Sequence, residues 1–135
     1  MIIGIGTDLV DIRRIESLLE KFGKHFAEKI FTAHERSYAE NSAHPLRVYA
    51  NRFAAKEAAA KALGTGFREG IGWHDIEVLR TSMGAPTLSF HGKADERFFM
   101  LVPPGYVGVS HVSFSDEPPY SSAFVVLSAN VSRVQ

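Results

Sequence analysis

An alanine-rich segment at residues 52–64 constrains the fold of this 135-residue chain more than any other stretch. It reads Arg-Phe-Ala-Ala-Lys-Glu-Ala-Ala-Ala-Lys-Ala-Leu-Gly, and alanine, leucine, arginine, lysine and glutamate are the residues that most favour a helix. Pro45 suits the first turn of such a helix, and Gly64 suits its end. The sequence therefore predicts one long helix from about Pro45 to Leu63, against which the other elements must pack.

Glu57 is the residue of this helix that fits least well with an amphipathic pattern. At about 100° per residue it falls within an apolar arc, which is formed by Leu46, Tyr49, Ala50, Phe53 and Ala60. A carboxylate there is costly unless it meets a cation, a metal or hydrogen-bond donors. Lys61 follows one turn later, in the order that favours an ion pair. Two interpretations stay equally open: an ion pair that orients the helix, and a metal-ligating or catalytic carboxylate beside an anion-binding lysine.

The composition limits the class of protein. The 15 basic residues balance the 15 acidic ones, so the net charge does not indicate a nucleic-acid partner. The chain contains no cysteine, which excludes a disulfide framework, a thiolate zinc site and a cysteine nucleophile. Residues 1–6 lack the features of a signal peptide, and no apolar run approaches the length of a membrane span. We therefore expect a cytoplasmic protein that binds neither nucleic acid nor membrane.

The rest of the chain predicts a mixture of strands and helices. Residues 2–7 are an apolar run typical of a buried strand, and Thr32 with Glu35 matches a capping box at the start of a short helix. The expected order is a strand at 2–7, helices at 11–22, 25–30, 33–40 and 45–63, a hairpin at 76–90, a helix at 91–101, and strands at 107–115 and 123–127. This order predicts one α+β domain, residues 1–135, with helices packed on a small, mainly antiparallel sheet.

The last two strands differ in how their side chains alternate. In residues 107–115, His111 and Ser113 share a face with two valines, so this face is expected to line a site or a subunit interface. Residues 123–127 are apolar on both faces, which predicts a central strand. The residues after Ala129 are expected to form a frayed tail.

Asp8 and Glu57 are the two acids that exposure to solvent explains least. Asp8 follows the first strand, where it could bind a metal or phosphate, although its position alone favours a helix N-cap. Two carboxylates, with water and phosphate oxygens, suit Mg²⁺, whereas the lack of cysteine and of a suitably spaced histidine pair argues against zinc. The residues alone thus indicate a Mg²⁺–phosphate site with Lys61 as an anion partner, without distinguishing phosphoryl transfer from nucleotide binding.

The first predicted helix and the turn after it carry a cluster of basic residues. These residues are Arg13, Arg14, Lys21 and Lys24. Such a face is usually only solvated, but clustered cations also attract acidic partners. The pattern therefore leaves open whether this face is a docking surface.

Two separate segments resemble the signatures of the 4′-phosphopantetheinyl transferases. Residues 4–10, Gly-Ile-Gly-Thr-Asp-Leu-Val, resemble the first signature, and residues 52–62 resemble the second. The resemblance continues, in order, through residues 64–66, 73–78, 84–86 and 111–113, so it covers nearly the whole chain. Within this family the chain is most similar to the short bacterial type, the holo-[acyl-carrier-protein] synthases.

The resemblance implies an activity and a set of site residues. Members of the family transfer the 4′-phosphopantetheine arm of coenzyme A to a serine of apo acyl carrier protein and release adenosine 3′,5′-bisphosphate, a step of fatty acid biosynthesis. The resemblance implies that Asp8 and Glu57 bind Mg²⁺ and that Lys61 contacts phosphate and can assist proton transfer. It further implies a coenzyme A pocket lined by Arg52, Lys61, Gly84, Pro86, His111 and Ser113. The attacking serine belongs to the partner, so the chain needs no nucleophile of its own.

The resemblance also implies two kinds of partner. Carrier proteins that this family recognises are strongly acidic in the region that is recognised. The resemblance therefore implies that such a protein binds the basic face of Arg13, Arg14, Lys21 and Lys24. The short type forms homotrimers with sites between subunits, which would explain the polar face of residues 107–115.

One segment departs from the family pattern. Many short-type members carry Ser-His or Thr-His where this chain has Ser115 and Asp116, so the role of that histidine does not transfer. Asp116 could be a base, a further metal contact or only an acid in the turn that follows, and the residues slightly favour the turn. The sequence leaves open the general base, the preferred carrier protein, the tolerance of acylated coenzyme A and the proof of a trimer. Another Mg²⁺-dependent phosphoester enzyme and a non-enzymatic coenzyme-binding module are the alternatives.

Overall fold

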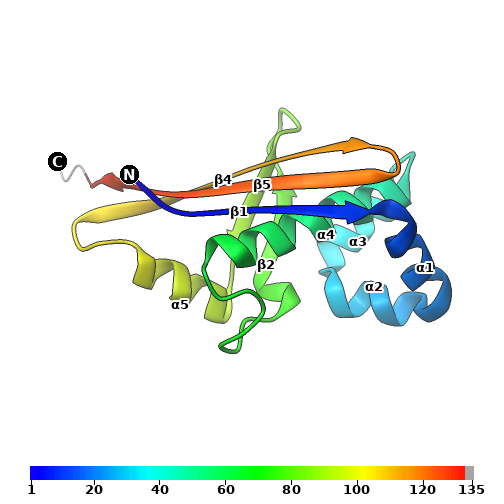
Figure 1. Cartoon of the computed structure of the whole chain (residues 1–135), viewed down its shortest axis with the longest axis horizontal. Helices are drawn as coiled ribbons and strands as arrows, with labels where there is room; N and C mark the ends of the chain where they lie inside the picture. Colours follow the sequence, from blue (N-terminus) through cyan, green and yellow to red (C-terminus); the bar gives the residue numbers. More distant parts are fainter. Residues whose placement is uncertain (133–135) are drawn as a thin grey trace.

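The computed structural model describes residues 1–132 and places the helices on one side of a three-stranded sheet (Figure 1). The strands lie in the order β1-β5-β4, and both neighbouring pairs are antiparallel. They comprise β1 (Ile2–Asp11), β4 (Tyr106–Glu117) and β5 (Tyr120–Val131). The predicted α+β class, with helices packed on a mainly antiparallel sheet, is confirmed, and so is the central position of the last strand.

The long helix α4 (Pro45–Ala62) lies against this sheet and contacts β1 and β5. Before it come three short helices: α1 (Ile12–Phe22), α2 (Lys24–Ile30) and α3 (Ala33–Glu40). After it come the one-turn helix η1 (Trp73–Asp75), the antiparallel hairpin of β2 (Ile76–Arg80) and β3 (Pro86–Phe90), and α5 (Gly92–Leu101). Figure 1 shows the first three helices at one end of the sheet and α5 at the other, while the tip of the hairpin rises past the sheet.

Two glycines of β1 allow α4 to approach the sheet very closely. A Cβ atom at Gly6 would lie 1.9 Å from the carbonyl oxygen of Ala58, and one at Gly4 would lie 2.2 Å from that of Ala62. Both distances are far below van der Waals contact, so only glycine fits at these positions. The glycines of the first signature therefore fix β1 against the second signature, and this contact determines how Asp8 lies relative to Glu57.

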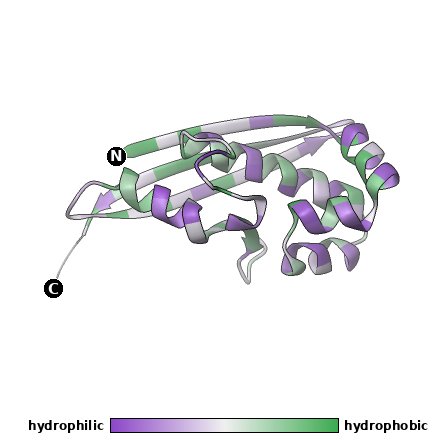
Figure 2. Ribbon diagram, turned by 90° about the horizontal axis from the view of Figure 1, so that it is seen from below, coloured by the Kyte–Doolittle hydropathy of each residue, from purple (hydrophilic) through white to green (hydrophobic). Residues whose placement is uncertain are grey.

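The two faces of the sheet have different environments. On β5, Ala123, Val125 and Leu127 are buried beneath the helices. The alternate residue Phe124 pairs with Thr7 and Ser113 on the other face and is 51% exposed. Figure 2, which looks at the molecule from the helical side, shows hydrophobic and hydrophilic residues interspersed along the strands. The sheet thus has an inner face against α4 and an outer face that no element within residues 1–132 covers.

The helix α4 is not amphipathic in the way that the sequence predicted. Its alanines are buried on several sides, and the fully buried charged residues are Arg52 and Lys56, whereas Glu57 is only partly buried. The prediction assumed that only one face of the helix is buried, but the sheet, α1, α3 and β2 all contact this helix. Small alanine side chains make this possible, because they let several elements approach one helix at once.

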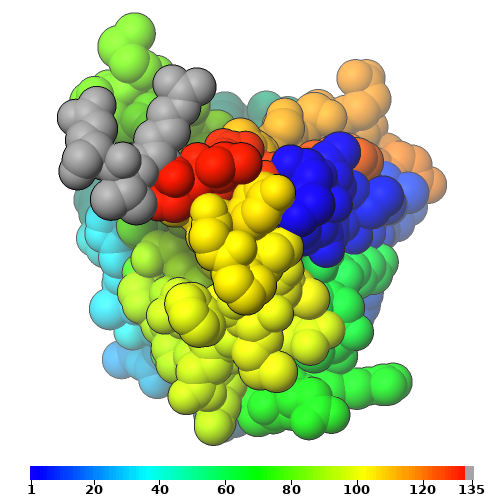
Figure 3. Space-filling view, turned by 90° about the vertical axis from the view of Figure 1, so that its left-hand side faces the viewer, coloured from blue at the N-terminus to red at the C-terminus, as the bar shows by residue number. Residues whose placement is uncertain are grey.

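The N-terminal residue is hydrogen-bonded to the last part of β5. The Met1 ammonium donates to the carbonyl oxygen of Ala129 at 2.7 Å, and the Ala129 N–H donates to the carbonyl oxygen of Met1 at 2.8 Å. Figure 3 faces this end of the molecule, where the N-terminus, the end of β5 and α5 lie together. The expected frayed tail after Ala129 is therefore wrong as far as Val131, because β5 extends to that residue; residues 133–135 lie outside the described part. No helix within residues 1–132 has the length and apolar character needed to cross a membrane.

Candidate active site

Asp8 lies inside β1 and does not cap the following helix. The strand continues to Asp11, and the Asp11 carboxylate accepts a hydrogen bond from the Arg13 N–H at 2.9 Å as the N-cap of α1. The N-cap interpretation of Asp8 is therefore wrong, because the strand is four residues longer than its apolar run. Asp8 pairs with Ala123 on the inner face of the sheet, so its side chain is on the side of α4.

Asp8 and Lys61 meet where β1 crosses α4, and the charges of both act on Glu57. The Lys61 ammonium lies 3.2 Å from Asp8 Oδ1 and 3.0 Å from the carbonyl oxygen of Thr7. The Asp8 side chain is 16% exposed, whereas that of Lys61 is 53% exposed. Among the described residues no ion pair joins Lys61 to Glu57, so the orienting pair that the helical spacing suggested is not formed. Lys61, in the second signature, instead forms an ion pair with Asp8 in the first signature.

The carboxylate of Glu57 lacks sufficient compensation from positive charge. Burial raises its pKa, and the neighbouring charge of Asp8 raises it further, while the cations Lys61 and Arg14 offset this rise only in part. A raised carboxyl pKa means that the charged form is disfavoured in its surroundings. Two carboxylates that share one close lysine therefore leave a deficit of positive charge, which a divalent cation would fill.

The donor set fits Mg²⁺ better than a metal that needs a complete protein cage. Within residues 1–132 no group of three or more His, Cys, Asp or Glu side chains is placed to hold a metal. Mg²⁺ usually keeps several waters and binds through one or two carboxylates plus phosphate oxygens of the substrate. Asp8 and Glu57 provide two such carboxylates, so the residues present fit this ion.

The predicted coenzyme-binding residues of β4 lie on the opposite face of the sheet. His111 pairs with Val126 and Ser113 pairs with Phe124, which places both on the outer face. His111 Nε2 lies 3.3 Å from Ser128 Oγ. Asp8 is on the inner face, so one copy of the chain does not bring these three side chains into a single pocket.

Arg52 lies on a further side of α4 and is only 1% exposed. Its guanidinium stacks on the ring of Tyr38, with 4.4 Å from the guanidinium carbon to the ring centroid. Burial lowers the pKa of Arg52, and the nearby charge of Arg80 lowers it further. Nε and Nη1 of Arg52 are buried without a hydrogen-bond partner in the described part of the chain. Buried donors rarely stay unpaired, so these two atoms have room for an acceptor that the described residues do not supply.

The predicted turn of Gly84 and Pro86 is connected to Arg52 through Arg80. The Arg80 guanidinium also lies over the Tyr38 ring, at 5.3 Å from its centroid, and its Nη1 donates to the carbonyl oxygen of Gly84. Gly84 has φ of 87°, a conformation that favours glycine. Arg52 and Arg80 thus both lie against Tyr38, and Arg80 joins them to the hairpin turn. Asp8 and Glu57 are not part of this group.

The four residues of the predicted docking face differ in how free they are. Arg13 is held against Asp11, with 2.6 Å between Nη2 and Oδ2, and Lys24 lies 3.6 Å from a Glu28 carboxylate oxygen. Arg14 lies over the Phe53 ring at 5.7 Å, and its charge acts on Glu57. Lys21 lies over the ring of Phe22, at 5.3 Å from its centroid. The charges of Arg13 and Lys24 are therefore partly neutralised, while Arg14 lies at the edge of the candidate site.

Asp116 lies in β4 rather than in the turn that follows it. Its Oδ2 is 2.7 Å from Nε of Arg47, in the first turns of α4, and its side chain is 23% exposed. The turn is shorter than predicted, because β4 extends to Glu117 and pairs with Tyr120. Asp116 is thus one partner of an ion pair with Arg47, in which neither Asp8 nor Glu57 takes part.

Three residues near the site were not predicted from the sequence. Arg80 ends a strand and gave no signal of its own. Lys56 and Glu35 form an ion pair in which both side chains are 0% exposed, with 2.7 Å between Nζ and Oε1. Lys56 lies in the second signature, and Glu35 was assigned only to the capping box, which the structure confirms. No sequence pattern connects two residues on different helices, so the pairing itself had no signal.

Known proteins resemble this chain over nearly its whole length. Residues 4–107 match the family model of the 4′-phosphopantetheinyl transferase superfamily. A holo-[acyl-carrier-protein] synthase of Methylobacterium sp. (strain 4-46) is 53% identical over 129 residues, which cover 96% of each chain.

Solved structures show the same arrangement of elements. The holo-[acyl-carrier-protein] synthase of Neisseria meningitidis is 38% identical, with a TM-score of 0.82 over 95% of this chain and 99% of that chain. The corresponding protein of Bacillus anthracis, in complex with CoA (3′,5′-ADP), is 34% identical, with a TM-score of 0.75 over 96% and 98%. This chain therefore belongs to the 4′-phosphopantetheinyl transferase superfamily.

Proposed function

We propose that this chain is a Mg²⁺-dependent holo-[acyl-carrier-protein] synthase. It transfers the 4′-phosphopantetheine arm of coenzyme A to a serine of apo acyl carrier protein, giving holo carrier protein and adenosine 3′,5′-bisphosphate. The observation that carries the proposal is the meeting of Asp8, Glu57 and Lys61, with a deficit of positive charge at Glu57. Support comes from relatives of this name, among them the Bacillus anthracis protein in complex with CoA (3′,5′-ADP). This activity belongs to the cytoplasm and to fatty acid biosynthesis.

In this proposal the residues of the two signatures bind the pyrophosphate end of coenzyme A. Asp8 and Glu57 would hold Mg²⁺, which when bound neutralises negative charge on the pyrophosphate. Lys61 is half exposed, and its ammonium lies beside the Asp8 carboxylate. It would therefore donate to a phosphate oxygen next to the metal and stabilise the charge that develops on it. The serine hydroxyl gives its proton to a base, its oxygen bonds to the phosphorus that carries the pantetheine arm, and the bond from this phosphorus to the bridging oxygen breaks. The adenosine bisphosphate leaves with that oxygen.

The other predicted residues would bind the adenosine end of coenzyme A. Arg52 offers two buried N–H groups without partners in the described residues, which suits an anionic group of the coenzyme. Gly84 lies in the nearby turn, and Pro86 begins β3 directly after it. His111 and Ser113 would contribute from the outer face of the sheet, together with Lys61 from the carboxylate side.

A homotrimer with sites between subunits would bring these separated groups together. Within one copy, His111 and Ser113 lie on the face of the sheet opposite to Asp8. The outer face exposes large apolar side chains, among them Ile5 at 60%, Leu9 at 67% and Phe124 at 51%. An apolar surface of this kind is typical of a surface that another protein covers. Sedimentation equilibrium should give three times the mass of the chain.

The basic residues of α1 and α2 are the proposed docking surface for the acidic carrier protein. Arg14 and Lys21 are seven residues apart on one side of α1, and Arg13 and Lys24 flank them. The double variant Arg14→Glu/Lys21→Glu should raise the Michaelis constant for carrier protein by about tenfold or more, because it reverses two charges that steer an acidic partner. Coenzyme A binding should be affected much less, because only Arg14 of this pair acts on Glu57, and equal damage to both substrates would contradict this assignment.

One assay tests the proposed activity. The protein is incubated with coenzyme A, Mg²⁺ and apo acyl carrier protein, and the carrier is weighed by mass spectrometry. A mass gain equal to phosphopantetheine is expected, and a far slower gain is expected with Glu57→Gln. Binding of coenzyme A without a mass gain in several carrier proteins would show a binding module instead, and turnover of coenzyme A without carrier protein would show a different phosphoester enzyme.

A further inference from the structure

A fully buried ion pair lies next to the proposed site, on the neighbouring residue of α4. The Lys56 ammonium is 2.7 Å from Glu35 Oε1, and both side chains are 0% exposed. The same ammonium donates to the carbonyl oxygens of Trp73 at 2.9 Å and Ile76 at 2.6 Å. An ammonium has three donors, and here all three are used. Lys56 therefore binds α4 both to α3 and to the start of β2.

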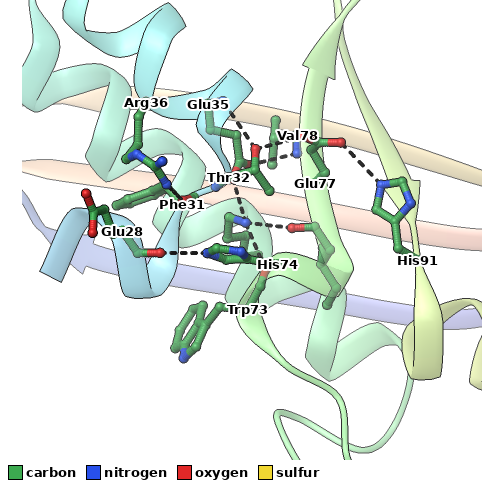
Figure 4. Close-up of polar contacts among 12 residues, drawn as sticks. Glu28, Phe31, Thr32, Glu35, Arg36, Trp73, His74, Glu77, Val78 and His91 are labelled. Carbon is green, nitrogen blue, oxygen red and sulfur yellow. Dashed lines mark hydrogen bonds and ion pairs between the residues drawn. The ribbon is translucent and has the colours of Figure 1, made fainter. Parts of the chain in front are cut away.

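Glu35 connects the same elements from the opposite side. Its Oε1 also accepts from the Thr32 N–H at 2.8 Å, and its Oε2 accepts from the Val78 N–H at 2.9 Å. Figure 4 shows Glu35 reaching from α3 to Val78 on β2, with Thr32 beside it. One carboxylate thus serves the capping box of α3, the lysine of α4 and the backbone of the hairpin.

The network continues along the hairpin. The Thr32 hydroxyl donates to Glu77 Oε2 at 2.7 Å, and Glu77 Oε1 lies 3.2 Å from His91 Nε2, just after β3 (Figure 4). The contacts that this network makes to β2 are all to Ile76, Glu77 and Val78, which precede Arg80 and the Gly84 turn. The hairpin is therefore anchored at its base, while its tip carries the proposed coenzyme-binding turn.

The position of Lys56 on α4 gives this anchor its importance. Lys56 immediately precedes Glu57, and Arg52 lies about one turn before it. The segment that holds the hairpin is thus the segment that carries the proposed metal ligand and the buried arginine. A shift of the hairpin base relative to α4 would move Arg80 and the turn away from Arg52.

We propose that Lys56 and Glu35 are positioning residues, which set the distance between the β2–β3 hairpin and α4 and so fix the shape of the coenzyme A site. The inference rests on the proposed function. Stability alone does not require such a pair, because replacing a buried ion pair by apolar side chains of similar volume is often neutral or stabilising. The hydrogen bonds to Trp73, Ile76 and Val78 are what an apolar pair cannot supply.

The test replaces both charges at once and compares affinity with stability. In Lys56→Met/Glu35→Met the volume is kept and neither charge is left unpaired. In Lys56→Met/Glu35→Gln the glutamine oxygen can still accept from the Val78 N–H, so the hairpin keeps one of its anchors. A matched control is Lys93→Gln/Glu96→Gln, which removes an ion pair of 3.1 Å whose side chains are 63% and 65% exposed.

For each variant the melting temperature, kcat and the Michaelis constants for coenzyme A and carrier protein are measured. We expect the Met/Met variant to fold with a Michaelis constant for coenzyme A raised about tenfold or more, since small displacements of positioning groups have effects of this size. The Met/Gln variant should show a smaller rise, and kcat and the constant for carrier protein should change by less than about threefold. The control should match the unmodified protein.

Each other outcome is also decisive. A Michaelis constant for coenzyme A within twofold of the unmodified protein in the Met/Met variant, or in the Met/Gln variant if only that one folds, would overturn the proposal. So would failure of both variants to fold, since the pair would then be needed for stability itself. Absence of transfer by the unmodified protein would instead refute the proposed function, and the two failures are therefore distinguishable.

Discussion

The helix α4 places two adjacent residues in two contrasting environments. Lys56 and its partner Glu35 are sealed from solvent, and the three donors of Lys56 and both oxygens of Glu35 are engaged. Glu57, the next residue, is partly exposed and faces the like charge of Asp8, with Lys61 bound to Asp8 rather than to Glu57. In the first environment the chain supplies every countercharge, and in the second it leaves one missing.

The contrast teaches how to separate structural from functional charges in this fold. A buried charge with all its partners inside the chain can serve packing and geometry. A carboxylate with a raised pKa and too little countercharge destabilises the free protein. Such a group is a candidate binding site for a ligand that supplies positive charge. This reasoning places the proposed Mg²⁺ beside Glu57 and assigns none to Glu35.

The largest effect should come from neutralising the acids of the open environment. Glu57→Gln and Asp8→Asn should each reduce transfer by roughly 10²–10³-fold or more, because each removes a carboxylate that would hold the Mg²⁺ that neutralises the reacting phosphates. The melting temperature should not fall for Glu57→Gln, and it should fall only slightly for Asp8→Asn, whose ion-pair partner Lys61 is half exposed. Initial rates from the carrier mass shift would measure this, with Glu96→Gln as an exposed acid control. Retention of more than a tenth of the activity in both variants would place the metal elsewhere.

The two lysines of α4 should separate stability from activity. Lys56→Met alone leaves Glu35 buried without a countercharge, which should cost about 3–5 kcal/mol of unfolding free energy. Lys61→Met removes a half-exposed lysine and should cost about 1 kcal/mol or less, while transfer falls roughly 10²-fold. Urea unfolding and initial rates measure the two quantities. If the two variants were equally stable, the contrast between the environments would be wrong.

A change in the contact between β1 and α4 should affect the open site selectively. Gly6→Ala places a methyl group 1.9 Å from the Ala58 carbonyl oxygen, so β1 must move away from the helix. Overpacking of this kind costs about 1–3 kcal/mol, and the movement separates Asp8 from Glu57. Activity should therefore fall at temperatures where the variant is still folded.

The control for this change is Gly72→Ala. A Cβ atom there would lie 3.7 Å from Asp75 Oδ2, which is ordinary contact. Circular dichroism and initial rates would show whether loss of activity precedes unfolding in Gly6→Ala. Full activity in that variant would mean that the spacing of β1 and α4 does not govern the site.

The smallest effect should be the pH dependence of stability in metal-free protein. The folded state raises the pKa of Glu57 above its ordinary value of 4.5, so folding favours the protonated form. Stability from this group is present below pH 4.5 and is lost as pH rises through the raised pKa. Glu57→Gln removes that loss, so in EDTA it should melt a few degrees higher than the unmodified protein at pH 7, with the difference vanishing near pH 4. An advantage that instead grows on acidification would contradict the sign of the shift.

Much of the fold could be predicted because its signals are local. Helix propensity located α4, the capping box of Thr32 and Glu35 located the start of α3, and alternation located the central strand β5. The convergence of Asp8 with Lys61 followed from the two family signatures rather than from spacing. Local signals also misled at the end of β1, where the apolar run stops at Thr7 but backbone pairing continues to Asp11.

The remaining features depend on contacts that no local pattern encodes. The apolar arc of α4 failed as a guide to burial because several elements pack around its alanines. The partner of Lys56 lies 21 residues earlier and already had a local role, so nothing in the sequence indicated the buried pair. Likewise, the opposite faces of Asp8 and His111 became apparent only from the register of three paired strands.

The central claim is that the open environment of α4 binds a divalent cation and the closed one does not. Calorimetric titration of Mg²⁺ in the presence of coenzyme A tests this most directly. We expect saturable Mg²⁺ binding to the unmodified protein. The Lys56→Met/Glu35→Met variant should also bind Mg²⁺, although it should need a higher concentration of coenzyme A. Glu57→Gln and Asp8→Asn should not bind Mg²⁺. Unchanged Mg²⁺ binding in both acid variants would contradict the account.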